Sequence, residues 1–393
     1  MRVVGVIAEY NPFHLGHAHH LAQARKLANA DAVVVVMSSL FTQRGDAAIL
    51  SPADRARMAL HCGADAVFAL PAAWAVRDAE HFALGGVSLL AGLGCDAISF
   101  GTEVVDIAAL QEAARLLEQP DESFRTALQS RLDSGIPHPA ALSAAMEEVL
   151  PGCGALLDTP NSTLAVCYLR AMLRTGSGMD VVPVQRIGRY HDSAIGSTLP
   201  SATALRGAIL RGDWPSVRKA MPEEAFAILR SAAEAGRLHH PDALDTALLY
   251  RLRTMSPADY AALPDVSEGI ENRLAASVET ARSREDLLQT AKTRRYPYAR
   301  LSRLATHALL GFTGEFLAAE SAPQAAWLLG FRRDARELFT HFKSHGTLPI
   351  LAKAADFDRS APWFQSEMRA WDIWALGAGL PAGLALTQGV TVI

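Results

Sequence analysis

Short apolar runs rich in β-branched residues alternate with longer amphipathic stretches along the first half of the chain. This alternation is typical of a parallel sheet covered by helices. The predicted strands are residues 3–8, 32–37, 66–70, 97–100 and 181–185. The predicted helices are residues 17–27, 52–62, 80–93, 107–117 and 163–174. We therefore expect an α/β fold whose first domain is a doubly wound, Rossmann-like sheet.

The pattern changes near Gly212. From there to about residue 345, alanine, leucine and arginine recur at helical spacing, and we find no comparable strand run. We therefore expect two domains, an α/β domain at residues 1–212 and a mainly α-helical domain at 213–393. The charge-free stretch 374–393 has about the length of a membrane span, but Pro381, Gln388 and four glycines interrupt it. We expect a packed C-terminal tail and no membrane partner.

Composition is that of a globular protein, because half of the 393 residues are hydrophobic and a fifth are charged. The formal net charge of −4 provides no overall attraction for nucleic acid, so a polyanion would need a local basic patch. The apolar run after Met1 is too short for a signal peptide and meets Glu9 at once. The four cysteines stand far apart, so we expect reduced thiols in a cytoplasmic protein.

The pattern H-x-G-H lies shortly after the first predicted strand, as His14, Leu15, Gly16 and His17. Open α/β sheets bind ligands at this carboxyl edge, and a helix beginning near Gly16 would add backbone N–H groups and a positive dipole end. The arrangement suits a phosphate. A histidine-rich helix cap is the alternative, and His19 and His20 are expected to be ordinary helix residues. A metal site is disfavoured because only Glu9 could join the histidines as a ligand.

A second candidate phosphate site follows Pro200. Ser201 is suited to cap a helix whose first turns carry Thr203 and Arg206, so that two hydroxyls and a guanidinium gather near a helix N-terminus. A simple cap is the alternative for Ser201.

Residues 282–303 have a net charge of +5 and two interleaved tyrosines. Such a stretch is suited to RNA phosphates and bases, although a solvated helix face has the same composition. The RNA-binding candidates are Arg294, Arg295, Arg300 and Arg303.

H-x-G-H near the amino terminus with a later S-x-T-x-x-R resembles the nucleotidylyltransferase superfamily. The blocks "GVIAEYNPFHLGHAHH", "FTQRGDAAI", "TPNSTLAVCYLRAM", "PSATALR" and "TRRYPYARLSRL" resemble, more closely, the bacterial tRNA(Met) cytidine acetate ligase family. The likeness extends from residue 1 to about 305. It implies ATP-dependent activation of acetate as acetyl-adenylate and acetyl transfer to N4 of the wobble cytidine of elongator tRNA(Met), presented by the anticodon loop.

The resemblance also implies an ATP site formed by Ile7, Ala8, Glu9, Tyr10, Asn11, Pro12, Phe13, His14, Leu15, Gly16, His17, Ala18, His19, His20, Gly101, Asn161, Arg186 and Ile187. In adenylyl transfer the substrate carboxylate attacks the α-phosphate, so the protein supplies positioning and charge stabilisation. The expected catalytic residues are His14, His17, Ser201, Thr203 and Arg206, with Mg²⁺ sharing the phosphate charge. The chain departs from the family pattern at Leu40, Thr102 and Ser162.

Two other functions remain open on the sequence. One is a small-molecule adenylyltransferase of cofactor biosynthesis, although such an enzyme has no use for a basic helical half. The other is a nucleotide-binding protein without catalysis. No protein partner can be inferred.

Overall fold

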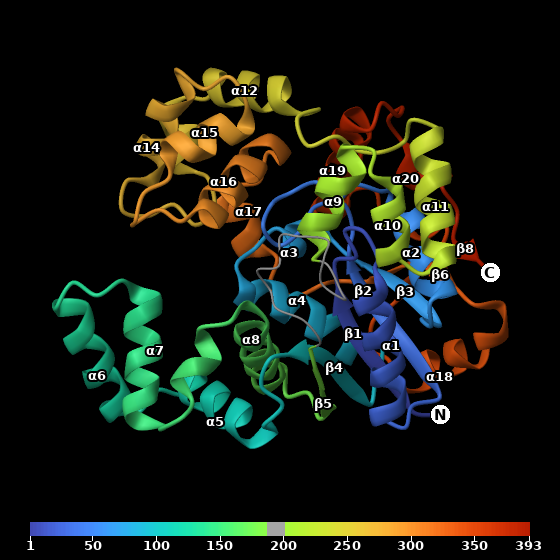
Figure 1. Ribbon diagram of the computed structural model, residues 1–393, viewed down its shortest axis with the longest axis horizontal. Coiled ribbons are helices and arrows are strands. Elements are labelled where there is room, and N and C mark those ends of the chain that lie inside the picture. Colours follow the sequence, from blue (N-terminus) through green and yellow to red (C-terminus); the bar gives the residue numbers. More distant parts are fainter. Residues whose placement is uncertain (187–200) are drawn as a thin grey trace.

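The computed structural model describes residues 1–186 and 201–393. Within these residues the chain forms one sheet of eight strands in the order β5-β4-β1-β2-β3-β6-β7, with β8 also paired to β6 (Figure 1). Strands β1 to β5 run parallel, and β6 is antiparallel to β3. The strands are β1 Val3–Ala8, β2 Ala32–Ser38, β3 Ala66–Leu70, β4 Ala97–Thr102, β5 Asp180–Gln185, β6 Ala326–Phe331, β7 Ile350–Leu351 and β8 Thr391–Val392.

Both faces of the sheet are covered by helices. Alternate β2 residues enter different cores, Val33 and Val35 on one face and Val34 and Val36 on the other, and all four are fully buried. Because successive side chains of a strand point to opposite faces, burial on both sides requires an uninterrupted apolar run. Helices α1, α2, α9 to α11 and α19 share the core on the first face, whereas α4, α8 and α18 pack on the second, with α5 to α7 continuing that core outward from α8 (Figure 1).

The helices of the described residues are mostly short. Those of the first half are α1 Leu15–Leu27, α2 Pro52–His61, α3 Ala72–Ala75, α4 Ala79–Gly92, α5 Ile107–Glu118, α6 Glu122–Asp133, α7 His138–Val149, η1 Gly154–Leu157 and α8 Pro160–Thr175. Those of the second half are α9 Ala202–Leu210, α10 Trp214–Ala220, α11 Glu223–Glu234, α12 Asp245–Thr254, α13 Pro257–Ala261, α14 Ile270–Val278, α15 Arg284–Ala291, α16 Tyr298–Leu310, α17 Gly314–Ala319, η2 Arg333–Ala335, α18 Glu337–His345, η3 Ala354–Asp356, α19 Pro362–Gly377 and α20 Leu384–Thr387.

Helices α12 to α16 form a separate group, which we call the helical group, with an apolar core of its own. Figure 1 shows it to one side of the sheet, in yellow and orange. The loop after β2 reaches into this group at Gly45, whose carbonyl oxygen accepts from Thr306 Oγ1 at 2.6 Å. Gly45 has φ +84°, and a Cβ there would lie 2.9 Å from the Ser302 carbonyl oxygen. Only glycine fits this junction without strain.

The five strands and five helices predicted in the first half are confirmed, with ends that move by at most three residues. The expectation that no strand follows Gly212 is wrong, because β6 inserts beside β3 and carries β7 and β8. The β6 sequence Ala-Trp-Leu-Leu-Gly-Phe has no β-branched residue, so its pattern resembles that of the neighbouring helices. Helices α9 to α11 and α19 also share a core with β1 and β2, so the apolar cores do not divide at residue 212.

The C-terminal tail is packed, as expected. Trp374 on α19 is fully buried, and β8 pairs with β6. Among the described residues, none of the helices has both the length and the apolar character needed to cross a membrane.

Candidate functional site

His14 and His17 form a stacked pair at the start of α1. His14 is the N-cap of the helix, and its Nδ1 accepts the N–H of Gly16 at 3.1 Å. The Nδ1 of His17 accepts the N–H of His14 at 3.2 Å, which completes a reciprocal capping box. The ring centroids are 3.7 Å apart. A Cβ on Gly16 would lie 2.9 Å from His14 Cε1, so the glycine makes room for the ring.

The hydrogen bonds of this pair define its tautomers. Each Nδ1 receives a backbone N–H, so in the neutral ring the proton is on Nε2, which remains a donor. Burial, together with the nearby positive charge of Arg186, lowers the pKa of His14 to about 4. Burial also lowers the pKa of His17 well below its usual value, with His14, His20 and Arg186 adding to the effect. Two neutral Nε2–H donors are therefore available at neutral pH.

His20 lies against the sheet, one turn after His17. Its Nε2 is 3.2 Å from the hydroxyl of the buried Ser99 on β4, and burial lowers its pKa to about 4. Arg186 also lowers the pKa of His20, so this guanidinium stands near all three buried rings. We expected His20 to be an ordinary helix residue, but its ring lies close to the candidate site.

Glu9 follows β1 directly and is held by two neighbouring segments. Its Oε1 accepts the N–H of Gln43 at 2.6 Å, and its carbonyl oxygen accepts from Arg55 Nη1 at 2.8 Å. Burial raises the pKa of the Glu9 carboxyl, and the positive charge of Arg206 partly opposes this rise. A carboxyl with a raised pKa is a better proton acceptor than an exposed one.

Arg55 on α2 holds the carboxyl ends of β1 and β2 together. It is fully buried, and it donates to the carbonyl oxygens of Glu9, Ser38, Ser39 and Leu50. Burial lowers its pKa to about 9, which still leaves the guanidinium charged at neutral pH. This role could not be predicted from the sequence, because a buried arginine in a helix has no local pattern.

Glu103 organises the carboxyl ends of β4 and β5. Its carboxylate accepts from Asn161 Nδ2 at 2.5 Å, Thr159 Oγ1 at 3.0 Å and the N–H of Ser162 at 3.0 Å. These hydrogen bonds lower the pKa of Glu103 against the opposing effect of burial. Asn161 Oδ1 in turn accepts from Arg186 Nη1 at 3.1 Å. Our sequence analysis missed Glu103, although an acidic residue directly after a strand could have indicated it.

The structure brings Gly101, Asn161 and Arg186 together, as the resemblance implied. A Cβ on Gly101 would lie 3.4 Å from Arg186 Cγ, so the two residues are in contact range. Ile187 lies outside the described residues. The two departures from the family pattern on this side compensate for each other, because the hydroxyls of Thr102 and Ser162 are buried and 3.1 Å apart. Leu40 is fully buried in the core on the α1 and α2 face of the sheet.

Helix α9 contacts the loop that contains His14. Ser201 is its N-cap and accepts the N–H of Ala204 at 3.2 Å, as expected of a cap. Arg206 Nη1 donates to the carbonyl oxygen of Asn11 at 2.8 Å, and its Nη2 lies 3.3 Å from Thr203 Oγ1. The Arg206 guanidinium thus stands beside the loop after β1, within the electrostatic range of Glu9.

The four arginines expected to bind RNA have different surroundings. Arg294 is exposed, and no partner of its side chain is found among the described residues. Arg295 pairs with Glu268 at 3.1 Å, and Arg300 donates to the Asp265 carbonyl oxygen and the Ser267 hydroxyl. Arg303 is largely buried, and burial lowers its pKa. Arg294 is therefore the member best suited to contact a phosphate directly.

The tyrosines interleaved with these arginines are engaged. Tyr296 donates to the Glu268 carbonyl oxygen at 2.5 Å and Tyr298 to the Glu285 carboxylate at 2.6 Å. Both rings pack against the core of the helical group. Stacking of free tyrosine rings on RNA bases, which the sequence suggested, would require these contacts to change.

Comparisons with known proteins identify the family of the chain. A family model described as HIGH Nucleotidyl Transferase matches residues 1–381. The tRNA(Met) cytidine acetate ligase of Acetivibrio thermocellus is 32% identical over 100% of both chains, and that of a Geobacillus species 34% identical over 94% of this chain and 93% of the relative. Thermotoga maritima TmcAL in its apo form gives a TM-score of 0.92 at 28% identity, over 100% of both chains. Its form bound with alpha-thio ATP gives 0.88 at 29% identity, over 98% of this chain and 96% of that chain.

Proposed function

Because the chain belongs to the HIGH nucleotidyl transferase family and, within it, to the tRNA(Met) cytidine acetate ligases, we propose that it acetylates N4 of the wobble cytidine of elongator tRNA(Met). ATP and acetate are the co-substrates, and acetyl-adenylate is the intermediate. The observation that carries this proposal is the stacked pair of neutral histidines at the carboxyl edge of the sheet, each with an Nε2–H donor for which the described residues provide no acceptor.

In the first step an acetate oxygen attacks the α-phosphate, and pyrophosphate leaves. His14 and His17 donate from Nε2 to the phosphate oxygens, on which charge increases in the transition state. Neutral donors suit this role because they need not lose a proton, and their fixed tautomers require no reorganisation. We assign the nucleotide to residues 7–20 together with Gly101, Asn161, Arg186 and Ile187. Arg186 adds a positive charge beside the histidines.

The β- and γ-phosphates belong, in this proposal, beside α9. Arg206 donates to the Asn11 carbonyl oxygen at the entrance of the histidine loop, the Thr203 hydroxyl lies beside Arg206, and Ser201 caps the same helix. Mg²⁺ is typically held by phosphates, waters and at most two carboxylates, and Thr203 offers a hydroxyl oxygen there. Within the described part of the chain, no group of three His, Cys, Asp or Glu residues could hold a metal by itself. Held mainly by the phosphates, the cation would neutralise charge on the departing pyrophosphate.

In the second step the cytidine N4 bonds to the acetyl carbon. The bond from that carbon to the AMP oxygen breaks, and N4 loses one proton. Glu9 is suited to accept this proton because burial raises its pKa and the Gln43 N–H fixes one carboxylate oxygen. No acyl-enzyme is needed. An anticodon loop presents the cytidine unpaired, so little energy is required to expose it.

RNA binding belongs to the helical group in this proposal, with activation belonging to the site built mainly by residues 1–212. The exposed Arg294 can contact a phosphate directly, whereas Arg295 and Arg300 would exchange protein acceptors for phosphate oxygens.

Reconstitution with purified protein tests the function. Labelled acetate, ATP and elongator tRNA(Met) transcript should give N4-acetylcytidine at position 34, detected by nucleoside mass spectrometry, with AMP formed in equal amount. A transcript with uridine at position 34 is the matched control and should remain unmodified. ATP consumption without acetylated nucleoside would contradict the proposal.

A further inference from the structure

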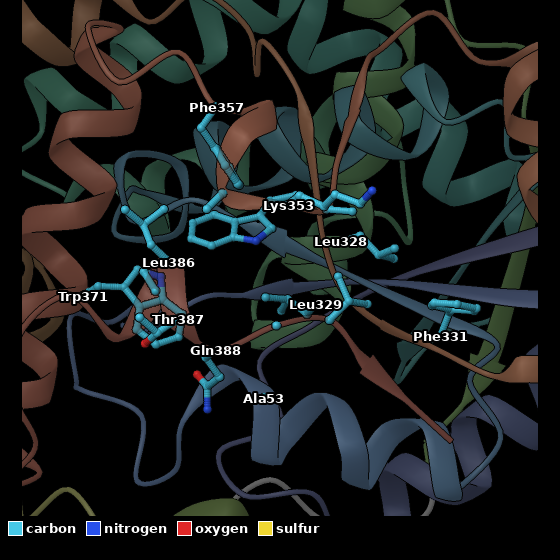
Figure 2. A pocket seen from close by; sticks show the side chains of 16 residues that line it. Ala53, Leu328, Leu329, Phe331, Lys353, Phe357, Trp371, Leu386, Thr387 and Gln388 are labelled. Atoms are coloured by element: carbon cyan, nitrogen blue, oxygen red, sulfur yellow. The ribbon is translucent and has the colours of Figure 1, made fainter.

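A cavity of about 400 Å³ lies between β6 and the C-terminal tail, away from the histidine site. Figure 2 shows its lining side chains. Trp327 and Leu329 come from β6, Phe357 from the segment before α19, Trp371 from α19 and Leu386 from α20. The volume lies in the range of small-molecule sites, and the walls are mainly apolar and aromatic, as such sites usually are.

Two polar groups of the lining could act on a ligand. Trp371 is 3% exposed, and its buried Nε1 has no hydrogen-bond partner within the described part of the chain. Lys353 is the one charged residue among the described lining residues. The nearby Asp356 carboxylate accepts the backbone N–H groups of Ala352 and Lys353. In Figure 2 the Lys353 amine and the Trp371 indole stand on opposite sides of the cavity.

We propose that this cavity binds a small amphipathic organic carboxylate. Its apolar body packs against Trp327, Phe357 and Trp371, its carboxylate pairs with Lys353 at the rim, and an acceptor atom at its other end receives the Trp371 Nε1–H. A buried donor without an acceptor costs free energy, so such a ligand gains more than its apolar contact alone. The positive rim selects an anion over its neutral analogue.

The site is connected to the sheet edge through α19. Glu367, one turn before Trp371, accepts the N–H of Ala72 at 2.6 Å at the end of β3. Trp374, one turn after it, donates from Nε1 to the Ala48 carbonyl oxygen at 2.7 Å. Ala48 belongs to the loop that also contains Gln43 and Gly45. A ligand against Trp371 therefore contacts the helix that holds two loops of the carboxyl edge.

Calorimetry with 4-(4-methoxyphenyl)butanoate tests the proposal, because this probe has an aromatic body, a carboxylate and a distant ether oxygen. We expect saturable binding with one site per chain, accompanied by a change in tryptophan emission because two tryptophans line the cavity. The neutral amide of the same acid should bind several-fold more weakly. Lys353→Gln should weaken binding of the acid about threefold, and Trp371→Phe by a similar factor.

Two further variants separate this cavity from other carboxylate sites. Leu386→Trp fills the cavity and should abolish binding, and Lys343→Gln, an exposed lysine on α18, is the control that should bind as the wild type does. If Leu386→Trp does not fold, Lys353→Gln and Trp371→Phe, which leave the apolar lining in place, still place the ligand in this cavity through its two polar contacts. Absence of saturable binding, equal affinity for acid and amide, or unchanged binding by Lys353→Gln would each overturn the proposal. If the probe binds in the acetate site instead, Lys353→Gln should bind it as the wild type does.

Discussion

The Arg284 guanidinium donates to the Asp46 carboxylate at 3.2 Å, which joins the helical group to the loop that follows β2. Arg284 also donates to the Gly45 carbonyl oxygen at 3.1 Å and to the Ser302 hydroxyl at 2.6 Å. The same loop supplies the Gln43 N–H that fixes Glu9. A displacement of the helical group would therefore be transmitted along this loop to the Glu9 carboxylate, which we assign to proton transfer.

The histidine pair gives the first prediction. His14→Ala or His17→Ala should lower the turnover of acetyl transfer by roughly 10²-fold or more, with a smaller change in ATP affinity, because the rings stabilise transition-state charge. Steady-state kinetics and ATP titration measure the two effects. His61→Ala on the exposed end of α2 is the control and should leave turnover unchanged. Near-normal turnover in both variants would contradict the assignment of His14 and His17 to transition-state stabilisation.

Glu9→Gln should slow the second step selectively. The amide oxygen can still accept the Gln43 N–H, so the loop geometry is retained while the proton acceptor is lost. We expect transfer to cytidine to fall roughly 10²-fold, and formation of acetyl-adenylate to change far less. Single-turnover experiments with labelled acetate separate the steps. An equal loss in both would indicate that Glu9 positions ATP or its metal instead.

The H-x-G-H site and the first five strands could be predicted because their signals are local. A run of β-branched residues favours a strand from its own composition. Gly16 is needed between the two histidines because a Cβ there would meet the His14 ring. The carboxyl edge then follows from the parallel order of the strands. His14, His17, Asn161, Arg186 and Arg206 therefore gather as the sequence suggested.

Other features depend on partners far along the chain. Residues 326–331 form strand β6 because β3 offers them a free edge to pair with. The six residues themselves do not indicate this pairing. Arg55 and Glu103 are single polar residues whose roles appear only when several loop ends meet. The burial of Arg303 likewise depends on the packing of α16 against the end of α3, where His307 Nε2 donates to the Val76 carbonyl oxygen at 2.6 Å.

The surroundings of the arginines alter what is expected of each. Arg294→Ala should weaken tRNA binding and reduce the slope of log affinity against log salt by about 0.7–0.9, the value for one lost phosphate contact. Arg295→Ala should change the slope less, because its charge is already paired with Glu268. Filter binding at several salt concentrations measures both. An unchanged slope for Arg294→Ala would assign this stretch to an ordinary solvated surface.

Glu367 should make stability depend on pH. It is 1% exposed, and burial raises its pKa to about 7, so the folded state retains a proton that the unfolded carboxyl loses near pH 4.5. The folded state is therefore increasingly destabilised as pH rises from about 4.5 to 7. Glu367→Gln removes this effect and keeps an acceptor for the Ala72 N–H. From pH 5 to pH 8, urea unfolding should show the variant gaining roughly 2 kcal/mol over the wild type; a constant difference would contradict this.

Arg284→Ala tests whether the two chemical steps belong to different parts of the chain. The variant loses the Asp46 ion pair but no group of the histidine site, so slow formation of acetyl-adenylate without tRNA should persist. Acetylation of tRNA should fall, because the helical group then holds the loop that fixes Glu9 less firmly, through contacts such as that of Thr306 with Gly45, and orients the bound RNA less well. Labelled ATP and acetate, with and without tRNA, measure both rates in one preparation. If Arg284→Ala loses basal activation as completely as His14→Ala, activation depends on the helical group, and the proposed division of labour is wrong.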